Sequence, residues 1–168
     1  MNVFRYNPVS SFLHCIVYVL KARIAYPRQN IGQEHILKDS GQFRTFLEID
    51  ILDRNKKKKK GQAVFRIIFH APRVPVQQII RRTRFTIPFF SGLPGFCTKQ
   101  FMVNAEKRQF SGRYEWETVE MAQNYARSYA VRFMKRRSRP FPIYYEITDK
   151  STDSVVESGS LKTAKGRS

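Results

Sequence analysis

The sequence predicts an α+β protein built on a ferredoxin-like βαββαβ sandwich, with an extension before it and a tail after it. Between residues 62 and 148, runs of β-branched and aromatic residues alternate with stretches of helical periodicity in the order strand, helix, strand, strand, helix, strand. Two interlocked βαβ units of this kind place both helices on one face of a four-stranded antiparallel sheet. A length of 168 residues, 42% of them hydrophobic, fits one compact domain.

The first strand and the first helix of this unit are predicted between residues 63 and 90. The run AVFRIIFH (63–70) lies between Gly61 and Pro72 and has the composition of a strand. Pro75 suits the first turn of a helix, and Pro88 is expected to end or distort the last turn. The apolar face of this helix comprises Val76, Ile79, Ile80, Thr83, Ile87 and Phe90.

The remaining elements follow between residues 96 and 147. Strands are predicted over 96–104 and 110–117, joined by the polar hairpin AEKRQ, and a last strand over 141–147. Thr118 is suited to cap a second helix. The apolar stripe of that helix comprises Val119, Ala122, Ala126, Tyr129 and Phe133.

The chain is predicted to divide into an N-terminal extension (1–61), the ferredoxin-like domain (62–148) and a polar tail (149–168). Five consecutive lysines, Lys56 to Lys60, favour solvated backbone and indicate a linker or loop. Before them, residues 43–52 alternate like a strand, which adds to an edge of the sheet or pairs through a long hairpin. The closing stretch SGSLKTAKGRS is small, polar and basic, which predicts disorder.

Charge, cysteine content and missing motifs restrict the compartment and the cofactors. The net charge of +18 attracts polyanions or anionic membranes, whether or not that attraction has a function. The apolar run from Phe12 to Leu20 is too short to span a bilayer. Cys15 and Cys97 lack the spacing of a zinc site or a disulfide framework, so we expect a cytoplasmic protein. The sequence contains no dinucleotide, nucleoside triphosphate, zinc-protease or serine-hydrolase motif, so neither a cofactor nor a metal is predicted.

One face of the predicted sheet has no layer to cover it. Depending on the register of the strands, its large apolar residues include Val64, Ile68, Met102, Tyr114, Trp116 and Tyr145. A soluble protein rarely leaves so much apolar surface in water, so a partner surface is expected on this face.

Four segments of the domain point to a known family: GLPGF before the second strand, FSGRYEW in the third, AQNYARSYAVRFM in the second helix, and RSRPFPIYYEI at the last strand. In these segments, residues 62–148 resemble the mono-oxygenases of the dimeric α/β-barrel superfamily, which includes the antibiotic-biosynthesis monooxygenases. The resemblance implies a homodimer whose two sheets face each other in a barrel, with a small cleft between sheet and helices. It implies no single reaction, because the superfamily also holds haem-degrading enzymes and proteins without an assigned reaction.

Tyr114 and Trp116, which share one face of the third strand, have three interpretations. They are core or dimer interface, which requires only close packing, or they are the wall of a pocket that stacks a planar aromatic substrate. As a third interpretation, they hold unstacked RNA bases, as aromatic residues do in an RNA-recognition motif. The neighbouring Glu115 and Glu117 argue against this third interpretation, because a surface that faces phosphates avoids negative charge.

His70 and Arg66 are the candidate catalytic residues, because they lie on the same side of the first predicted strand. A histidine at a strand end can act as a general base toward a phenol or enol, and an arginine can stabilise the resulting anion. The simpler interpretation places His70 in solvent at the start of a loop, and pairs Arg66 with Glu115 or Glu146 across strands.

Lys99 and Tyr144, together with Tyr114 and Trp116, are the candidate substrate-binding residues, although cross-strand pairing explains Lys99 and Tyr144 equally well. These residues and the resemblance together predict a homodimeric, cofactor-independent mono-oxygenase-like protein that acts on or binds a small aromatic or polyketide-like molecule. The alternative is a non-enzymatic binding or regulatory module whose basic surface takes a polyanion such as RNA, a partner that the sequence does not favour.

Overall fold

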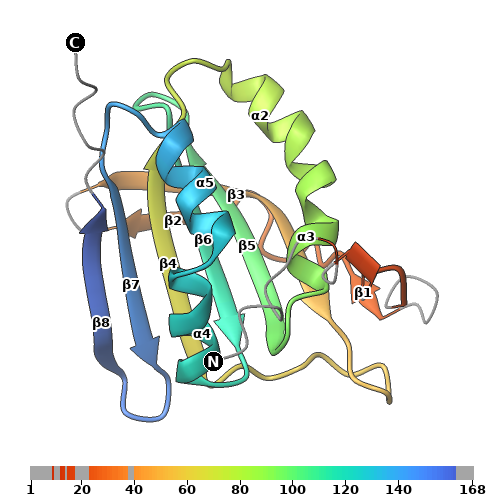
Figure 1. Ribbon diagram of the computed structural model, residues 1–168. Coiled ribbons are helices and arrows are strands. Elements are labelled where there is room, and N and C mark those ends of the chain that lie inside the picture. Colours follow the sequence, from red (N-terminus) through yellow and green to blue (C-terminus); the bar gives the residue numbers. More distant parts are fainter. Residues whose placement is uncertain (1–8, 10–11, 14, 18–22, 38–39, 162–168) are drawn as a thin grey trace.

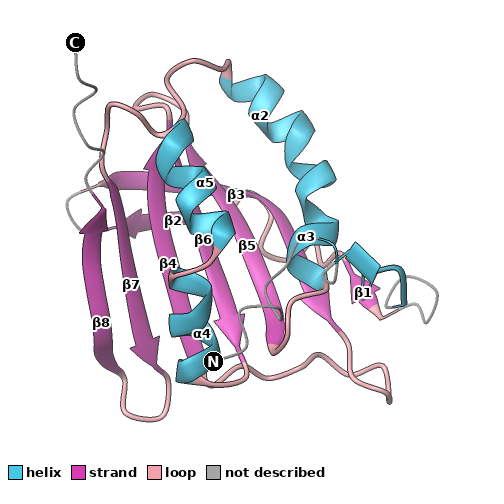
Figure 2. Ribbon diagram, viewed as in Figure 1, coloured by secondary structure: helices cyan, strands magenta, loops and turns pink. Residues whose placement is uncertain are grey.

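The computed structural model describes residues 9, 12–13, 15–17, 23–37 and 40–161. One antiparallel sheet carries helices on one face (Figures 1 and 2). The strands are β1 (Ile24–Ala25), β2 (Glu34–Leu37), β3 (Gly41–Ile51), β4 (Ala63–His70), β5 (Phe96–Asn104), β6 (Gln109–Trp116), β7 (Ile143–Asp149) and β8 (Ser154–Leu161). The helices are α2 (Val76–Thr83), the short 3-10 helix η2 (Arg84–Thr86), α3 (Ile87–Ser91), α4 (Val119–Ala126) and α5 (Tyr129–Arg137). No helix in the described ranges is long and apolar enough to cross a membrane.

The centre of the sheet confirms the predicted ferredoxin-like fold. Its strands lie in the order β5, β6, β4, β7, and every neighbouring pair is antiparallel. One helical segment, α2 to α3, connects β4 to β5, and the other, α4 to α5, connects β6 to β7. Both segments cover the same face of the sheet, as the two interlocked βαβ units require.

Strands from outside this unit extend the sheet at both ends. At one end β3 pairs with β5, and the short strands β1 and β2 pair with β3. This arrangement confirms a strand over residues 43–52. At the other end β8 pairs with β7, so the predicted disorder of the tail is wrong for residues 158–161, whereas residues 162–168 lie outside the described residues. The turn before β8 is specified by Asp149, whose carboxylate accepts hydrogen bonds from the backbone and hydroxyl of Ser151.

The lysine run forms a loop, as predicted, but two of its side chains are held in ion pairs. Lys58 lies 3.0 Å from a carboxylate oxygen of Asp50 and 3.6 Å from one of Glu48. Both acids are almost fully buried on β3. Lys59 lies 2.6 Å from Glu117. This loop therefore neutralises buried carboxylates and ties β3 to the rest of the sheet.

Both predicted helices are interrupted. Pro88, at the beginning of α3, lacks the N–H that would continue the α-helical bonding, and a 3-10 turn precedes it, as its position predicted. The predicted single stripe of the second helix is wrong beyond Ala126. Ser128 is extended and begins a new helix, which turns Tyr129 and Phe133 toward solvent and buries Val131 instead.

The main core lies between the sheet and the helices. Tyr114 and Trp116 point into it and are 1% and 0% exposed. Together with Tyr125 of α4 and Phe65 of β4 they form a continuous cluster of rings. Tyr145 also packs against this core. The prediction that Tyr114, Trp116 and Tyr145 share the opposite face with Val64, Ile68 and Met102 is therefore wrong, because the register of the sheet puts the two sets on different faces.

The opposite face of the sheet is covered in part by the chain itself. The hairpin of β2 and the first half of β3 crosses behind the sheet (Figure 1). Its Leu37 and Phe43 pack on Met102 of β5 and Ile68 of β4 in a second, smaller core. This hairpin supplies some of the apolar cover that the sequence assigned to a partner.

Candidate functional site

A cavity of about 1100 Å³ opens on the face of the sheet opposite the helices. We call it the open-face cavity. One wall comes from β4 and β7, and the other from the β2 hairpin that crosses this face. Of the residues that the sequence predicted for a site, His70, Arg66 and Tyr144 all line it. Figure 1 shows β2 crossing behind β4, and residues of both strands, which are far apart in the sequence, line the cavity.

His70 is the last residue of β4 and is held on two sides. Its ring stacks on Phe141, with 4.3 Å between ring centroids. Its Nε2 lies 3.1 Å from the amide nitrogen of Gln109, the residue directly opposite on β6, so the amide donates and the imidazole accepts. The backbone N–H of His70 donates to the Ser138 hydroxyl at 3.1 Å. Burial lowers the pKa of His70, which favours the uncharged ring at neutral pH.

Arg66 lies in the middle of β4, on the same face as His70. Its guanidinium is 3.7 Å from the Glu146 carboxylate of β7, the cross-strand pair that the sequence suggested. Glu115 pairs instead with Arg113 at 2.7 Å. Burial lowers the pKa of Arg66, but a guanidinium keeps its charge at any pH a protein tolerates. The site therefore offers a cation about 13 Å along the strand from an uncharged base.

Three polar atoms of this site are buried without a hydrogen-bond partner among the described residues: Nδ1 of His70, Oε1 of Gln109 and Nε of Arg66. Native proteins rarely leave such groups unsatisfied, because each one costs about 1–3 kcal/mol. Their concentration on two neighbouring strands marks the place where a ligand or ordered water improves the hydrogen bonding.

The other predicted substrate-binding residues, Tyr114, Trp116 and Lys99, lie on the helix side of the sheet. The sheet separates them from His70 and Arg66, and all three are buried. The Lys99 ammonium lies over the rings of Phe90, Phe101 and Tyr114, at 3.3, 4.0 and 4.3 Å from their centroids. Neither aromatic ring is exposed to stack on a nucleic-acid base, which removes the structural basis of that interpretation.

Several residues that line the open-face cavity were missed by the sequence reasoning. Gln109 and Phe141 were assigned to a hairpin and to a strand without a role, and Glu146 was considered only as an ion-pair partner of Arg66. His35, in the opposite wall, was missed with the whole of β2, because EHIL (34–37) does not alternate. A signal for the hairpin is the turn-forming pair Ser40 and Gly41, where Gly41 adopts a φ of 89°.

The fold and the site together define an α+β protein of ferredoxin-like topology with a polar cavity on its sheet face. Among the residues that the structure describes, no group of three or more His, Cys, Asp or Glu is placed to hold a metal ion.

No family model matches the chain, and neither does any curated protein. Among solved structures, the chain is similar to an uncharacterized ferredoxin fold protein from Listeria monocytogenes, described as related to antibiotic biosynthesis monooxygenases. The two share 12% identity over 67% of each chain, with a TM-score of 0.48. The assignment of the fold rests on the strand order of this chain.

Proposed function

We propose that the open-face cavity binds a small, flat, anionic aromatic molecule, and that His70 deprotonates it in a cofactor-independent, mono-oxygenase-like reaction. The observation that carries this proposal is the alignment of Arg66 and His70 along one strand of one cavity, with unsatisfied polar atoms at both residues. Their separation of about 13 Å matches a molecule of two or three fused rings.

The environment of His70 suits a general base. Because burial favours its uncharged form, the ring has a lone pair available at neutral pH. In the free protein the Gln109 amide occupies Nε2. A phenolic or enolic hydroxyl of the substrate takes the place of that amide and passes its proton to Nε2. Arg66, at the other end, binds the charge that the substrate already carries.

The reaction requires oxygen as the oxidant. Deprotonation makes the aromatic system electron-rich enough to reduce O₂. One oxygen atom then forms a carbonyl at a ring CH₂ group, and the other leaves as water together with the two hydrogens of that carbon. The protein contributes binding, orientation and the proton transfer.

Oxygen consumption with 4,5-dihydroxyanthrone-2-carboxylate, a three-ring phenol that carries a carboxylate charge and one reactive CH₂ group, tests the proposal. We expect His70→Gln to abolish oxygen uptake while the probe still binds, and Arg66→Gln to weaken binding. His35→Gln is the matched control, because His35 lines the opposite wall of the same cavity. Uptake that survives in His70→Gln overturns the catalytic role. Binding without any uptake in the unmodified protein leaves a protein that binds a small aromatic molecule without acting on it.

The homodimer stays a prediction. The uncovered apolar sheet face, from which a partner surface was predicted, is smaller than expected. Tyr114, Trp116 and Tyr145 lie in the core, and the β2 hairpin covers Ile68 and Met102. A dimer through this face has mostly charged and polar side chains to join. Light scattering of the purified protein measures the oligomeric state directly, and a monomer at all concentrations contradicts the paired-sheet barrel.

A further inference from the structure

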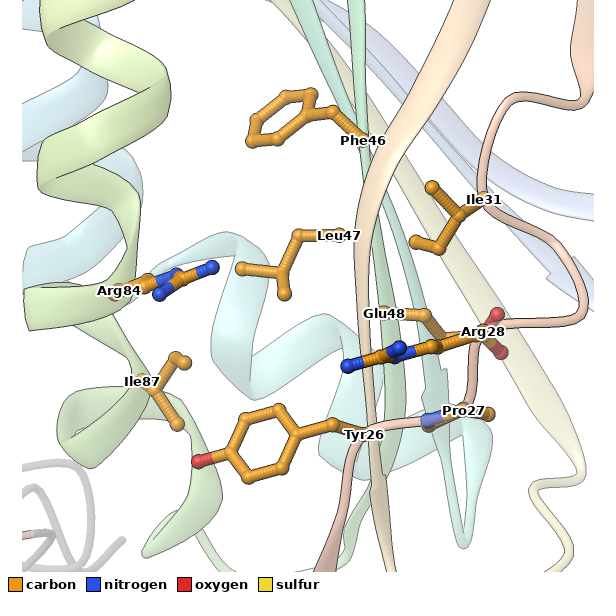
Figure 3. A pocket seen from close by; sticks show the side chains of 9 residues that line it. All are labelled: Tyr26, Pro27, Arg28, Ile31, Phe46, Leu47, Glu48, Arg84 and Ile87. Atoms are coloured by element: carbon orange, nitrogen blue, oxygen red, sulfur yellow. The ribbon is translucent and has the colours of Figure 1, made fainter.

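A second hollow, separate from the open-face cavity, lies where the N-terminal segment meets the helix layer. Its volume is about 730 Å³, the size of sites for drug-sized ligands. The segment 26–31 forms one side, β3 forms the back, and η2 with the beginning of α3 forms the other side (Figure 3). We call it the arginine groove.

The back of the arginine groove is apolar for a local reason. The pairing of β3 with β5 contains a bulge between Thr45 and Leu47, which makes Phe46 the extra residue. The bulge breaks the usual alternation, so that the neighbours Phe46 and Leu47 both line the groove. Ile87 of α3, only 6% exposed, completes the apolar surface.

Two arginines frame this apolar surface from opposite sides. Arg28 comes from the N-terminal segment and Arg84 from η2, and Figure 3 shows their guanidinium groups directed toward one another. Both side chains are exposed, and neither has an ion-pair or hydrogen-bond partner among the described residues. Two unpaired cations that face each other repel, so the arrangement favours an anion between them.

The acidic residue of the lining does not neutralise the arginines. Glu48 is 1% exposed, and its carboxylate accepts a hydrogen bond of 2.6 Å from Asn30 and lies 3.6 Å from Lys58. Both oxygens of its carboxylate therefore already have partners within the protein. The exposed phenol of Tyr26 adds a hydroxyl at the lower edge of the groove.

We propose that the arginine groove binds an amphipathic organic anion, with its carboxylate or sulfonate between Arg28 and Arg84 and its aromatic or aliphatic body on Phe46, Leu47 and Ile87. Planar guanidinium groups bind such oxyanions through paired hydrogen bonds, and a second guanidinium from the other side holds the anion in place. The apolar back favours an organic anion over inorganic phosphate, because phosphate has no apolar group to contact this surface.

The test uses 8-anilinonaphthalene-1-sulfonate, a fluorescent aromatic sulfonate, and N-phenyl-1-naphthylamine, which has the same rings without the charge. We expect one sulfonate probe to bind per chain in the groove. Arg28→Gln and Arg84→Gln each weaken its binding about tenfold, which corresponds to the loss of one charge-assisted hydrogen-bonded pair. The same variants change binding of the neutral probe less than twofold, because the apolar back is intact.

Arg81→Gln and Arg82→Gln are the matched controls, since they remove the same charge from exposed positions of α2 outside the groove. Arg66→Gln reports on the open-face cavity. Equal weakening in Arg81→Gln and Arg84→Gln overturns the proposal, because it shows attraction to the net positive charge alone. Loss of binding in Arg66→Gln, with none in Arg28→Gln, also overturns it. A circular dichroism melt of each variant shows that the fold is retained.

Discussion

The ammonium nitrogen of Lys99 lies 3.3 Å from the centre of the Phe90 ring, inside the core between sheet and helices. Phe101 and Tyr114 place two further ring faces near it. Ring faces attract a cation, but they replace only part of the hydration that a buried ammonium loses. Burial therefore lowers the pKa of Lys99 well below its ordinary value of 10.5.

Replacing Lys99 by methionine, which has a similar shape and no charge, is expected to stabilise the protein by about 2 kcal/mol at pH 7. In the wild type the unfolded chain gains a proton as the pH falls below 10.5, and the folded chain gains it only at lower pH. The free energy of unfolding of the wild type therefore decreases as the pH is lowered through that window, by about 1.4 kcal/mol per pH unit. Urea unfolding at pH 7 and pH 9.5 measures the difference between the two proteins, which shrinks at pH 9.5. A less stable Lys99→Met protein at pH 7 contradicts the argument.

Lys58 stabilises the carboxylates of Glu48 and Asp50, which are buried on β3. We expect Lys58→Ala to lower the free energy of unfolding by about 1–2 kcal/mol, since it leaves two neighbouring buried charges without their cation. Lys57→Ala is the control, because Lys57 belongs to the same exposed run and its side chain makes no ion pair among the described residues. Equal unfolding midpoints in urea for the two variants rule out this role for Lys58.

Gly112 is required by the ring of Tyr114, which lies across it. A Cβ atom at position 112 falls 2.6 Å from Cε2 of Tyr114, too close for real atoms. The ring cannot move aside, because Phe65, Trp116 and Tyr125 surround it. We expect Gly112→Ala to destabilise the fold by about 2–3 kcal/mol. Gly32→Ala, at an open position with a φ of 86°, is expected to cost only about 1 kcal/mol of backbone strain. Thermal unfolding of both variants compares the two costs.

The pKa of His70 can be measured without knowing a substrate. Its ring signals in NMR spectra, assigned by their loss in His70→Gln, are expected to titrate with a midpoint below the ordinary 6.5, because burial disfavours the imidazolium. Since the unfolded chain takes up this proton first, stability is lost as the pH falls from 6.5 toward the lower folded-state pKa. In the proposed reaction, catalysis by the uncharged ring is expected to fail over the same pH range. A midpoint at or above 6.5 shows that the ring is not buried as described.

The sequence was sufficient for the central fold because the periodicity of its elements is strong. Runs of β-branched and aromatic residues in 63–70, 96–104 and 110–117 predicted the strands, and Pro88 predicted the distortion of the first helix. Which face of each strand is buried was not predictable, because strand register depends on pairing between residues far apart in the chain. For that reason Tyr114 and Trp116 were assigned to the uncovered face as well as to the core.

The candidate site was predictable only in part. His70 and Arg66 were found because they share one strand, so a period of two is enough to relate them. The opposite wall was not, because it depends on a hairpin whose strand β2 has four residues and no clear period. The polar residues of the tail form β8 because they pair with the free edge of β7. That edge exists only in the assembled sheet, so β8 was not predictable from the tail sequence alone.

β3 pairs with β2, which precedes it in the chain, and with β5, which follows much later, so these two pairings become possible at different times during synthesis. Residues 34–51 leave the ribosome more than forty residues before β5. The β2–β3 hairpin can therefore form before β5, the other neighbour of β3, has been synthesised. During that interval Ile49 and Ile51, which end in the main core, have no strand to cover them. Glu48 and Asp50 alternate with these two isoleucines along the chain. Charged residues in such positions limit the aggregation of an exposed apolar strand until β5 is available for pairing.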